Sequence, residues 1–355
     1  MQIDLIMYPI CHVKMETKIY IDPRSAIFYS SFYIKGLYGY FGKRNVSFST
    51  KYFKELDNID ILMAFVIITD GRITRYIIDY RDQNDIIQGA YEWCNIYAKI
   101  NINNSIDYVN TDKLIHIPPG FGIRIWTIFQ TLYYLVYNFF RAGIYKNNRA
   151  LNIHVQPKRW VRGYLSQIKR QSIDSYKAEG NNNTADNYIF FVSTYRNGTD
   201  ETNQNRNQFI VACSENKNIR FEGGFFVPKS IDSTDIEIAK NLSFNSFLSN
   251  SEYMRKIKQS IFVFNTPAVH KCHGWKLGEF LAMGKAIITT PFYNDLPFQM
   301  EHSKEILIVN NEKEIREAVQ LLWEDKKLRK TLERNAKQYY DTYASPYKVI
   351  QHVVK

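Results

Sequence analysis

The sequence is poor in the features that mark disulfide-stapled, secreted or zinc-binding proteins. Its 355 residues include only four cysteines, Cys11, Cys94, Cys213 and Cys272, with no CxxC pair and no zinc-ligand spacing. Cysteines scattered in this way are typical of reduced thiols in a cytosolic protein. Residues 1–15 show neither a basic segment nor a cleavage-site pattern, so we expect no signal peptide and a cytoplasmic location.

Long apolar runs and the common nucleotide motifs are also missing. An uncharged segment at residues 125–140 is short for a membrane span, and Gln130, Thr131 and Asn138 lower its hydrophobicity further. The sequence has no Walker phosphate loop, no strand-linked GxGxxG and no nucleophile elbow. These absences argue against a P-loop nucleotidase, a dinucleotide-binding dehydrogenase of the usual type and an α/β-hydrolase.

The composition is nevertheless that of a globular, basic protein. Hydrophobic residues make up 45% of the sequence and charged residues 23%, and the length suits two domains. The net charge of +11 indicates an acidic partner, which is a nucleic acid, an anionic membrane surface or a phosphorylated substrate. No recognisable nucleic-acid-binding module accompanies the charge, so we do not expect nucleic acid as a partner.

Short apolar runs alternate with helical patterns through the N-terminal part of the sequence. The strand-like runs are residues 3–8, 18–21, 45–49, 61–69 and 75–80, followed by a strand that ends in a Pro/Gly loop at 113–122. Helical spacing occurs at residues 25–42, and residues 85–100 read as a helix followed by a strand. This alternation predicts a parallel sheet with helical crossovers, in an N-terminal domain over residues 1–180.

Three features of this domain have two interpretations each. Gly36 and Gly39 either let a helix approach another group closely or relieve crowding against a neighbour. The PPGFG loop at residues 118–122 either lines an acceptor cleft or is a plain tight connection. Asp79 and Asp82 either face the cleft or serve in ion pairs and caps.

The uncharged segment carries an aromatic stripe at helical spacing. Trp126, Phe129, Tyr133, Tyr137 and Phe140 recur three or four residues apart. The charged residues that follow are mostly basic: Arg141, Lys146, Arg149, Lys158, Arg159, Arg162, Lys169, Arg170 and Lys177, against Asp174 and Glu179. An aromatic face with a basic flank is typical of a helix that lies on an anionic leaflet. The alternative is a buried crossover helix with solvated basic neighbours.

A second domain follows a polar, Asn-rich stretch at residues 179–187, which we predict to be a linker. The strand-like runs are residues 187–194, 219–226, 261–264, 286–290 and 306–309, the 219–226 run reading as a strand followed by a loop. Helical patterns begin near Asn203 and cover residues 251–260, 276–284, 312–324, 326–341 and 345–354. We therefore predict an α/β domain over residues 187–340 and a separate C-terminal helix within 341–355.

The best-defined part of this domain is residues 261–291, IFVFNTPAVHKCHGWKLGEFLAMGKAIITTP. The segment predicts a buried strand, a polar loop, a helix that stops at Gly284, and a second buried strand. In open α/β sheets, ligands bind at the carboxyl ends of the strands. The residues expected around that crevice are His270, Lys271, His273, Gly274, Lys276 and Glu279.

The helix that begins at Lys276 predicts an anion site. Its first-turn N–H groups are free and its dipole is positive there, which suits a phosphate. Lys276 adds a positive charge where the dipole disfavours one, so an anionic ligand explains this lysine better than helix stability does. Glu279 lies one turn later and can accept two hydrogen bonds from a vicinal diol such as that of ribose. Diphosphate and ribose together describe a nucleotide-sugar.

The same residues carry a family resemblance. KLGEFLAMGKAIITTP, residues 276–291, resembles the donor-binding segment of GT-B glycosyltransferases, especially the retaining family four. Gly274, Glu279 and Gly284 match that pattern, whereas its first acidic position falls on Lys271. The resemblance implies two Rossmann-like domains facing a central cleft, a final helix that returns to the N-terminal domain, and retention of anomeric configuration.

The resemblance and the helix argument together give each candidate residue a role. We expect three basic side chains to act on the leaving diphosphate or the donor sugar during catalysis: Lys276, Arg206 and His273. We expect the donor to be held by Glu279 at the ribose, by Gly274, Lys276 and Arg196 near the diphosphate, and by Glu222 and Gly223 near the base. His270 and His273 have no further ligand cluster, so we expect no metal.

We therefore predict a glycosyltransferase of cell-surface polysaccharide synthesis. Its donor would be a nucleoside-diphosphate sugar of the UDP or GDP type, with no cofactor, and its acceptor a glycan or polyprenyl-linked oligosaccharide. We expect it in the cytoplasm, with peripheral attachment to the cytoplasmic face of an anionic membrane. No DxD pair lies at a strand end, and GT-B enzymes stabilise the leaving diphosphate with a helix dipole and basic side chains instead of a metal. Two alternatives stay open: a nucleotide-sugar epimerase on the same fold, and a non-catalytic glycan- or membrane-binding relative.

Overall fold

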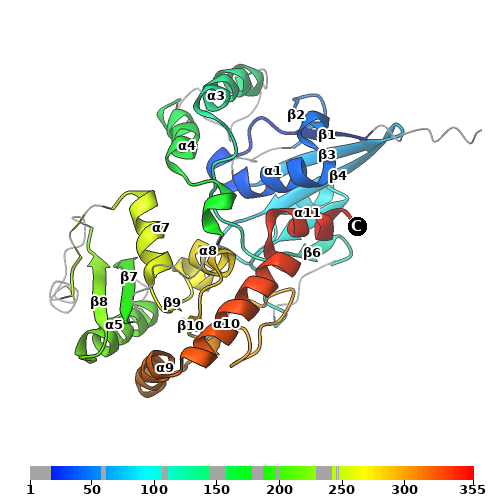
Figure 1. Ribbon diagram of the computed structural model, residues 1–355. Coiled ribbons are helices and arrows are strands. Elements are labelled where there is room, and N and C mark those ends of the chain that lie inside the picture. Colours follow the sequence, from blue (N-terminus) through cyan, green and yellow to red (C-terminus); the bar gives the residue numbers. More distant parts are fainter. Residues whose placement is uncertain are drawn as a thin grey trace, which may run out of the picture.

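The chain forms two α/β parts that meet along a shared interface (Figure 1). The computed structural model describes residues 17–56, 61–105, 111–143, 157–177, 187–196, 200–228, 242–244, 246 and 248–355. The predicted α/β class is confirmed, and parallel strand pairs predominate. Several predictions lie outside the described residues: the strand at 3–8, Cys11, nearly all of the linker at 179–187, Lys146 and Arg149.

Six strands form the N-terminal sheet, in the order β2-β1-β3-β4-β5-β6. They are β1 (Thr17–Ile21), β2 (Val46–Phe48), β3 (Met63–Thr69), β4 (Arg72–Asp79), β5 (Ile96–Lys99) and β6 (Leu114–His116). The predicted parallel sheet is confirmed for the pairs β1–β2, β4–β5 and β5–β6, whereas β3 runs antiparallel to both β1 and β4. Asp70 and Gly71 explain the β3–β4 hairpin, since their φ angles of 50° and 81° are the left-handed pair that a two-residue turn requires.

Helices cover both faces of this sheet, and one of them comes from the far end of the chain. The helices of the N-terminal part are α1 (Ile27–Phe41), α2 (Gln88–Trp93), α3 (Ile128–Gly143) and α4 (Pro157–Lys169). Helix α11 (Pro346–Val354) packs along α1 (Figure 1). A Cβ added at Gly36 would overlap the carbonyl oxygen of Pro346. Gly36 therefore makes room for a neighbouring helix.

The C-terminal part has five short parallel strands. They are β7 (Tyr188–Thr194), β8 (Arg220–Phe226), β9 (Val263–Asn265), β10 (Ile287–Thr289) and β11 (Leu307–Ile308). A backbone hydrogen bond of 2.9 Å from Ile261 to Tyr188 sets β9 beside β7. The helices are α5 (Asp200–Glu215), α7 (Asn250–Gln259), α8 (Trp275–Met283), α9 (Glu312–Glu324) and α10 (Lys326–Tyr339). Ile189 and Phe191 pack on the α5 side while Tyr188 and Phe190 pack on the α7 and α8 side, as in a sheet covered on both faces.

Strand β8 differs from the prediction of a strand followed by a loop. Gly223 and Gly224 lie inside the strand, with φ angles of 149° and 143°. A Cβ at Gly223 would overlap the carbonyl oxygen of Phe191 on β7, and one at Gly224 would overlap that of Leu242. The two glycines thus permit close backbone contacts on β8 and do not form a binding loop.

The two parts of the molecule meet where the PPGFG loop packs against α8. Residues 117–123 are all buried. A Cβ at Gly278 on α8 would lie 2.9 Å from the Pro119 carbonyl oxygen, and one at Gly122 would lie 3.0 Å from the ring of Trp275. Of the two interpretations of this loop, the buried position fits the tight connection. The loop fixes the first turn of α8 against the N-terminal part.

Candidate active site

Helix α8 begins at the interface, and its predicted boundaries are confirmed to within one residue. Its last turn ends at Gly284, which adopts the left-handed conformation with φ 61° and donates its N–H to Phe280 and Leu281. Its first turn lies near the carboxyl ends of β7 and β9, the edge at which open α/β sheets bind ligands. Lys276 lies in this first turn, and Glu279 follows it one turn later on α8.

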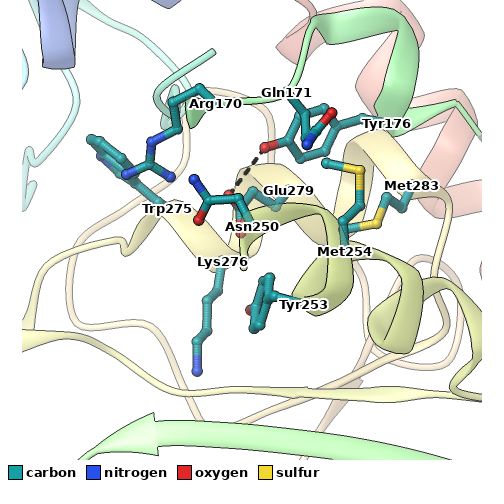
Figure 2. Close-up of a pocket in the computed structure, with 10 residues that line it drawn as sticks. All are labelled: Arg170, Gln171, Tyr176, Asn250, Tyr253, Met254, Trp275, Lys276, Glu279 and Met283. Atoms are coloured by element: carbon teal, nitrogen blue, oxygen red, sulfur yellow. Dashed lines mark hydrogen bonds between the residues drawn. The ribbon is translucent and has the colours of Figure 1, made fainter. Parts of the chain in front are cut away.

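Lys276 reaches from α8 toward β7 (Figure 2). Its Nζ donates a 2.7 Å hydrogen bond to the carbonyl oxygen of Val192 and lies 4.9 Å from the centre of the Phe191 ring. Burial and, to a smaller extent, the positive charge of Arg206 lower the pKa of Lys276 to about 7, against an opposing effect of Glu279. A lysine held in this state gains its proton when an anion arrives.

Lys276 forms part of the wall of a first cavity, of about 320 Å³, which we name the cation cavity. Its lining residues are Asp82, Val192, Ser193, Thr194, Arg196, Thr202, Arg206, Ala268 and Lys276. Arg206 donates from Nε to the Thr266 hydroxyl at 2.9 Å, and burial together with Arg196 lowers the pKa of Arg206 to about 10. Three basic side chains in the wall of one cavity favour an anionic ligand.

A second cavity, of about 280 Å³, lies along the other side of Lys276, and we name it the Glu279 cavity. Figure 2 shows its lining residues: Arg170, Gln171, Tyr176, Asn250, Tyr253, Met254, Trp275, Lys276, Glu279 and Met283. The carboxylate of Glu279 is 8% exposed and accepts a 3.4 Å hydrogen bond from the Tyr176 hydroxyl. Burial raises the pKa of Glu279 to about 7, although Arg170 and Lys276 act in the opposite direction.

Lys276 belongs to the walls of both cavities, so one elongated ligand can occupy both. An anionic group would meet Lys276, Arg196 and Arg206 on one side. A polar, partly aromatic group would meet Glu279 and Tyr253 on the other. The arrangement matches a ligand that is charged at its centre or end and carries hydroxyl groups and a ring nearby.

The predicted histidine lies at the interface and in neither cavity. The backbone N–H of His273 donates to Asn101 at 2.9 Å, and its Nε2 lies 3.0 Å from the carbonyl oxygen of Asp295. Burial lowers the pKa of His273 to about 4, so the ring is neutral and donates from Nε2 to that carbonyl. These contacts tie the loop before α8 to its surroundings.

Gly274, the other residue predicted in this loop, is the N-cap of α8. Its φ of −82° is a backbone conformation that any residue can adopt.

The two residues predicted to contact the base also lie outside both cavities. Glu222 forms an ion pair of 2.7 Å with Lys256 and accepts a 2.6 Å hydrogen bond from the Tyr188 hydroxyl. Although burial raises the pKa of Glu222, its hydrogen bonds to Lys256 and Tyr188 outweigh this effect and lower it. Gly223 is needed for the close approach of β8 to β7. Both positions have structural explanations here.

The two aspartates of the N-terminal part have different environments. Asp79 is fully buried and forms ion pairs with Lys99 and Arg81, each at 2.9 Å, so its ion-pair interpretation is confirmed. Asp82 instead lines the cation cavity, together with residues contributed by β7, α5 and α8. It brings a carboxylate from the N-terminal part to the wall of this cavity.

Sequence reasoning missed most of the Glu279 cavity. Arg170 was considered only as part of a basic flank, yet its guanidinium group stacks on Phe28 at 4.8 Å and on Trp275 at 4.9 Å. Tyr176 and Tyr253 carried no motif, because their role depends on a contact with α8 from far along the chain. The sequence feature that could have predicted this cavity is the occurrence of aromatic residues near a basic one, and that feature is weak evidence for a binding site.

The described residues offer neither a cluster of metal ligands nor a membrane-spanning helix. No three His, Cys, Asp or Glu side chains among them come together as ligands of a metal ion would. None of the helices in the described ranges combines the length and the apolar character needed to cross a bilayer.

Comparison with known proteins gives distant structural likenesses only. No protein-family profile matches the chain, and no curated protein matches it. The C-terminal domain of a glycosyl transferase group 1 family protein (LpcC) from Francisella tularensis is 15% identical, covers 48% of this chain and 96% of that domain, and has a TM-score of 0.36.

Two other solved structures show how broad these likenesses are. S. aureus TarM, in complex with fondaparinux, alpha-GlcNAc-glycerol and UDP, is 10% identical over 78% of this chain and 49% of its own, with a TM-score of 0.41. A putative UDP-N-acetylglucosamine 2-epimerase from Listeria monocytogenes is 12% identical over 72% of this chain and 73% of its own, with a TM-score of 0.33. At these TM-scores the likenesses do not identify the activity of this chain.

Proposed function

We propose that this protein is a glycosyltransferase that transfers a sugar from a nucleoside-diphosphate donor to a glycan or lipid-linked acceptor. The observation that carries the proposal is the pair of cavities that share Lys276 in their walls, one basic and one containing a buried carboxylate. The donor would be of the UDP or GDP type and would need no further cofactor. Cell-surface polysaccharide synthesis is the process that we expect it to serve.

The diphosphate would lie in the cation cavity. Arg196 and Arg206 line it from the segment after β7 and from α5, while Lys276 lines it from the first turn of α8. The hydrogen-bond partners that Lys276 and Arg206 have in the structure are neutral oxygens of Val192, Thr194 and Thr266, so these partners do not offset the positive charge that a bound anion would meet. Fixed cations of this kind stabilise a leaving diphosphate as negative charge develops on it.

The nucleoside would lie in the Glu279 cavity. Ionised Glu279 accepts hydrogen bonds from the two ribose hydroxyls, and Tyr176 orients the carboxylate by donating to it. Tyr253 offers an aromatic surface to the base in the same cavity. Glu222, Gly223 and His273 are left out of this proposal because their contacts tie them into the fold.

The transfer itself exchanges one carbon–oxygen bond for another. The bond between the anomeric carbon and the diphosphate breaks, and its electron pair leaves with the nucleoside diphosphate. An acceptor hydroxyl forms the new bond and loses its proton. Asp82 is the carboxylate that reaches the cation cavity from the N-terminal part, so we propose it as the group that takes this proton.

Release of nucleoside diphosphate from a panel of UDP- and GDP-sugars, with glycan and polyprenyl-phosphate acceptors, tests the proposal. Glu279→Ala should lower turnover at least a hundredfold, because the ribose loses its partner in a buried site. Glu317→Ala is the matched control, since its carboxylate is exposed on α9. Wild-type turnover by the Glu279 variant would contradict the site. NMR of the donor incubated alone would reveal an epimerase by a changed sugar without acceptor.

A further inference from the structure

Helix α3 exposes an unusually apolar side to solvent. That side carries six large apolar residues: Ile128, Phe129, Leu132, Tyr133, Val136 and Phe140. Phe129 is 86% exposed and Phe140 is 69% exposed. The inner side has apolar residues packed against the core and also two fully buried polar ones, Thr131 and Asn138. A surface helix in contact with water usually presents charged and polar residues on its outer side.

The buried polar residues of α3 donate hydrogen bonds within the fold, whereas the side-chain oxygen Oδ1 of Asn138 has no partner among the described residues. Asn138 donates from Nδ2 to the Tyr164 hydroxyl on α4 at 2.8 Å, and the Thr131 hydroxyl donates to the Thr127 carbonyl at 2.9 Å. The orientation of α3 is therefore fixed by its contacts with α4, and its apolar side is directed outward. One sequence expectation is corrected here: Trp126 precedes the helix and is buried against Tyr134, so it is not part of the exposed stripe.

Helix α4 lies beside α3 and extends the same surface (Figure 1). Its exposed residues mix two apolar side chains, Val161 and Leu165, with basic ones: Lys158, Arg159, Arg162 and Lys169. The sequence contains no Asp or Glu between Asp112 and Asp174. We call the exposed residues of α3 and α4 the α3–α4 surface. It combines apolar area with positive charge only.

We propose that the α3–α4 surface docks on an anionic lipid bilayer. The apolar residues of α3 would enter the boundary between headgroups and acyl chains, while the basic residues of α4 would contact the anionic headgroups. A second copy of the chain fits poorly, because self-association would oppose two positively charged surfaces. Lys169 precedes Arg170 and Gln171 in the wall of the Glu279 cavity, so the docked surface leads directly to the cleft.

Sedimentation of the full chain with lipid vesicles tests this inference. Vesicles of phosphatidylcholine with about a third phosphatidylglycerol should bind the protein at least tenfold more tightly than pure phosphatidylcholine vesicles, and less tightly as salt is added. The double variant Phe129→Gln/Phe140→Gln should lower the partition coefficient at least tenfold. Lys158→Gln/Arg162→Gln should lower it by a similar factor on the anionic vesicles alone.

Matched controls separate docking from general effects of the substitutions. Ile73→Gln/Leu321→Gln removes two exposed apolar side chains elsewhere, and Lys313→Gln/Lys327→Gln removes two exposed charges from α9 and α10. Both should bind vesicles as the wild type does, and all variants should keep wild-type affinity for nucleoside diphosphate. Equal binding to both vesicle types, or unchanged binding by the Phe129/Phe140 variant, would overturn the inference. A wild-type dimer that this variant converts to a monomer would assign the surface to self-association instead.

Discussion

Replacing Lys276 with methionine should stabilise the protein while abolishing its use of nucleotide. Burial and Arg206 lower the pKa of Lys276 from 10.5 to about 7. The unfolded chain keeps this lysine protonated up to about pH 10, so folding at lower pH must bury a charge or remove a proton. A residue whose folded pKa is depressed therefore destabilises the fold most at low pH.

The size of this effect follows from the shift in the pKa of Lys276. Each pKa unit corresponds to about 1.4 kcal/mol, which gives a cost of about 5 kcal/mol at pH 6 and about 2 kcal/mol at pH 9. Solvent in the two cavities screens part of this charge, so we take about half of each value. Methionine also loses the hydrogen bond to Val192, about 1 kcal/mol. The expected gain in the free energy of unfolding is about 1.5 kcal/mol at pH 6 and about zero at pH 9.

Urea unfolding of the wild type and of Lys276→Met at pH 6 and pH 9 measures this difference. Titration calorimetry with UDP and GDP should show at least a thirtyfold loss of affinity in the same variant. Lys313→Met is the control, because this side chain is 84% exposed and should change neither quantity. A variant that is less stable at both pH values, or whose gain does not depend on pH, would refute the reasoning about a buried, depressed lysine.

Two further substitutions distinguish the residues that we keep in the site from those that we leave out. Arg206→Gln should weaken nucleoside diphosphate binding at least tenfold and leave nucleoside binding unchanged, because we place the guanidinium group against the phosphates. Calorimetry with both ligands measures this, with Arg316→Gln as the control. An equal loss of affinity for the nucleoside would contradict the prediction. Gly223→Ala should lower the free energy of unfolding by about 2–4 kcal/mol, since its φ of 149° and the contact with β7 exclude a side chain. Thermal unfolding tests the second substitution against Gly89→Ala, where a Cβ meets open space, and an unchanged melting temperature would show that β8 tolerates the change.

The sequence predicted the local elements of the site well, because their signals are local. The strand, loop and helix around Lys276 follow from apolar runs and from Gly284, and the structure confirms them. Arg206 and Arg196, selected by the family resemblance, do line the same cavity as Lys276. The antiparallel placement of β3 was missed, although Asp70 and Gly71 between two strand-like runs are a strong hairpin signal.

The remainder depended on contacts between distant parts of the chain. Tyr176 reaches Glu279 across 103 residues, and no local pattern marks that pairing. The periodicity of residues 125–140 correctly placed Phe129, Tyr133 and Phe140 on one side of a helix, but Trp126 precedes that helix and Tyr137 packs against the core. It did not show that the polar residues Thr131 and Asn138 would be the buried ones, because that depends on how α4 packs.

A crystal structure with bound UDP or GDP tests the central claim most directly. The account predicts the diphosphate in the cation cavity, within hydrogen-bond distance of Lys276, Arg206 and the first N–H groups of α8, and the ribose hydroxyls on the carboxylate of Glu279. A nucleotide bound elsewhere, with protein side chains filling both cavities, would contradict it.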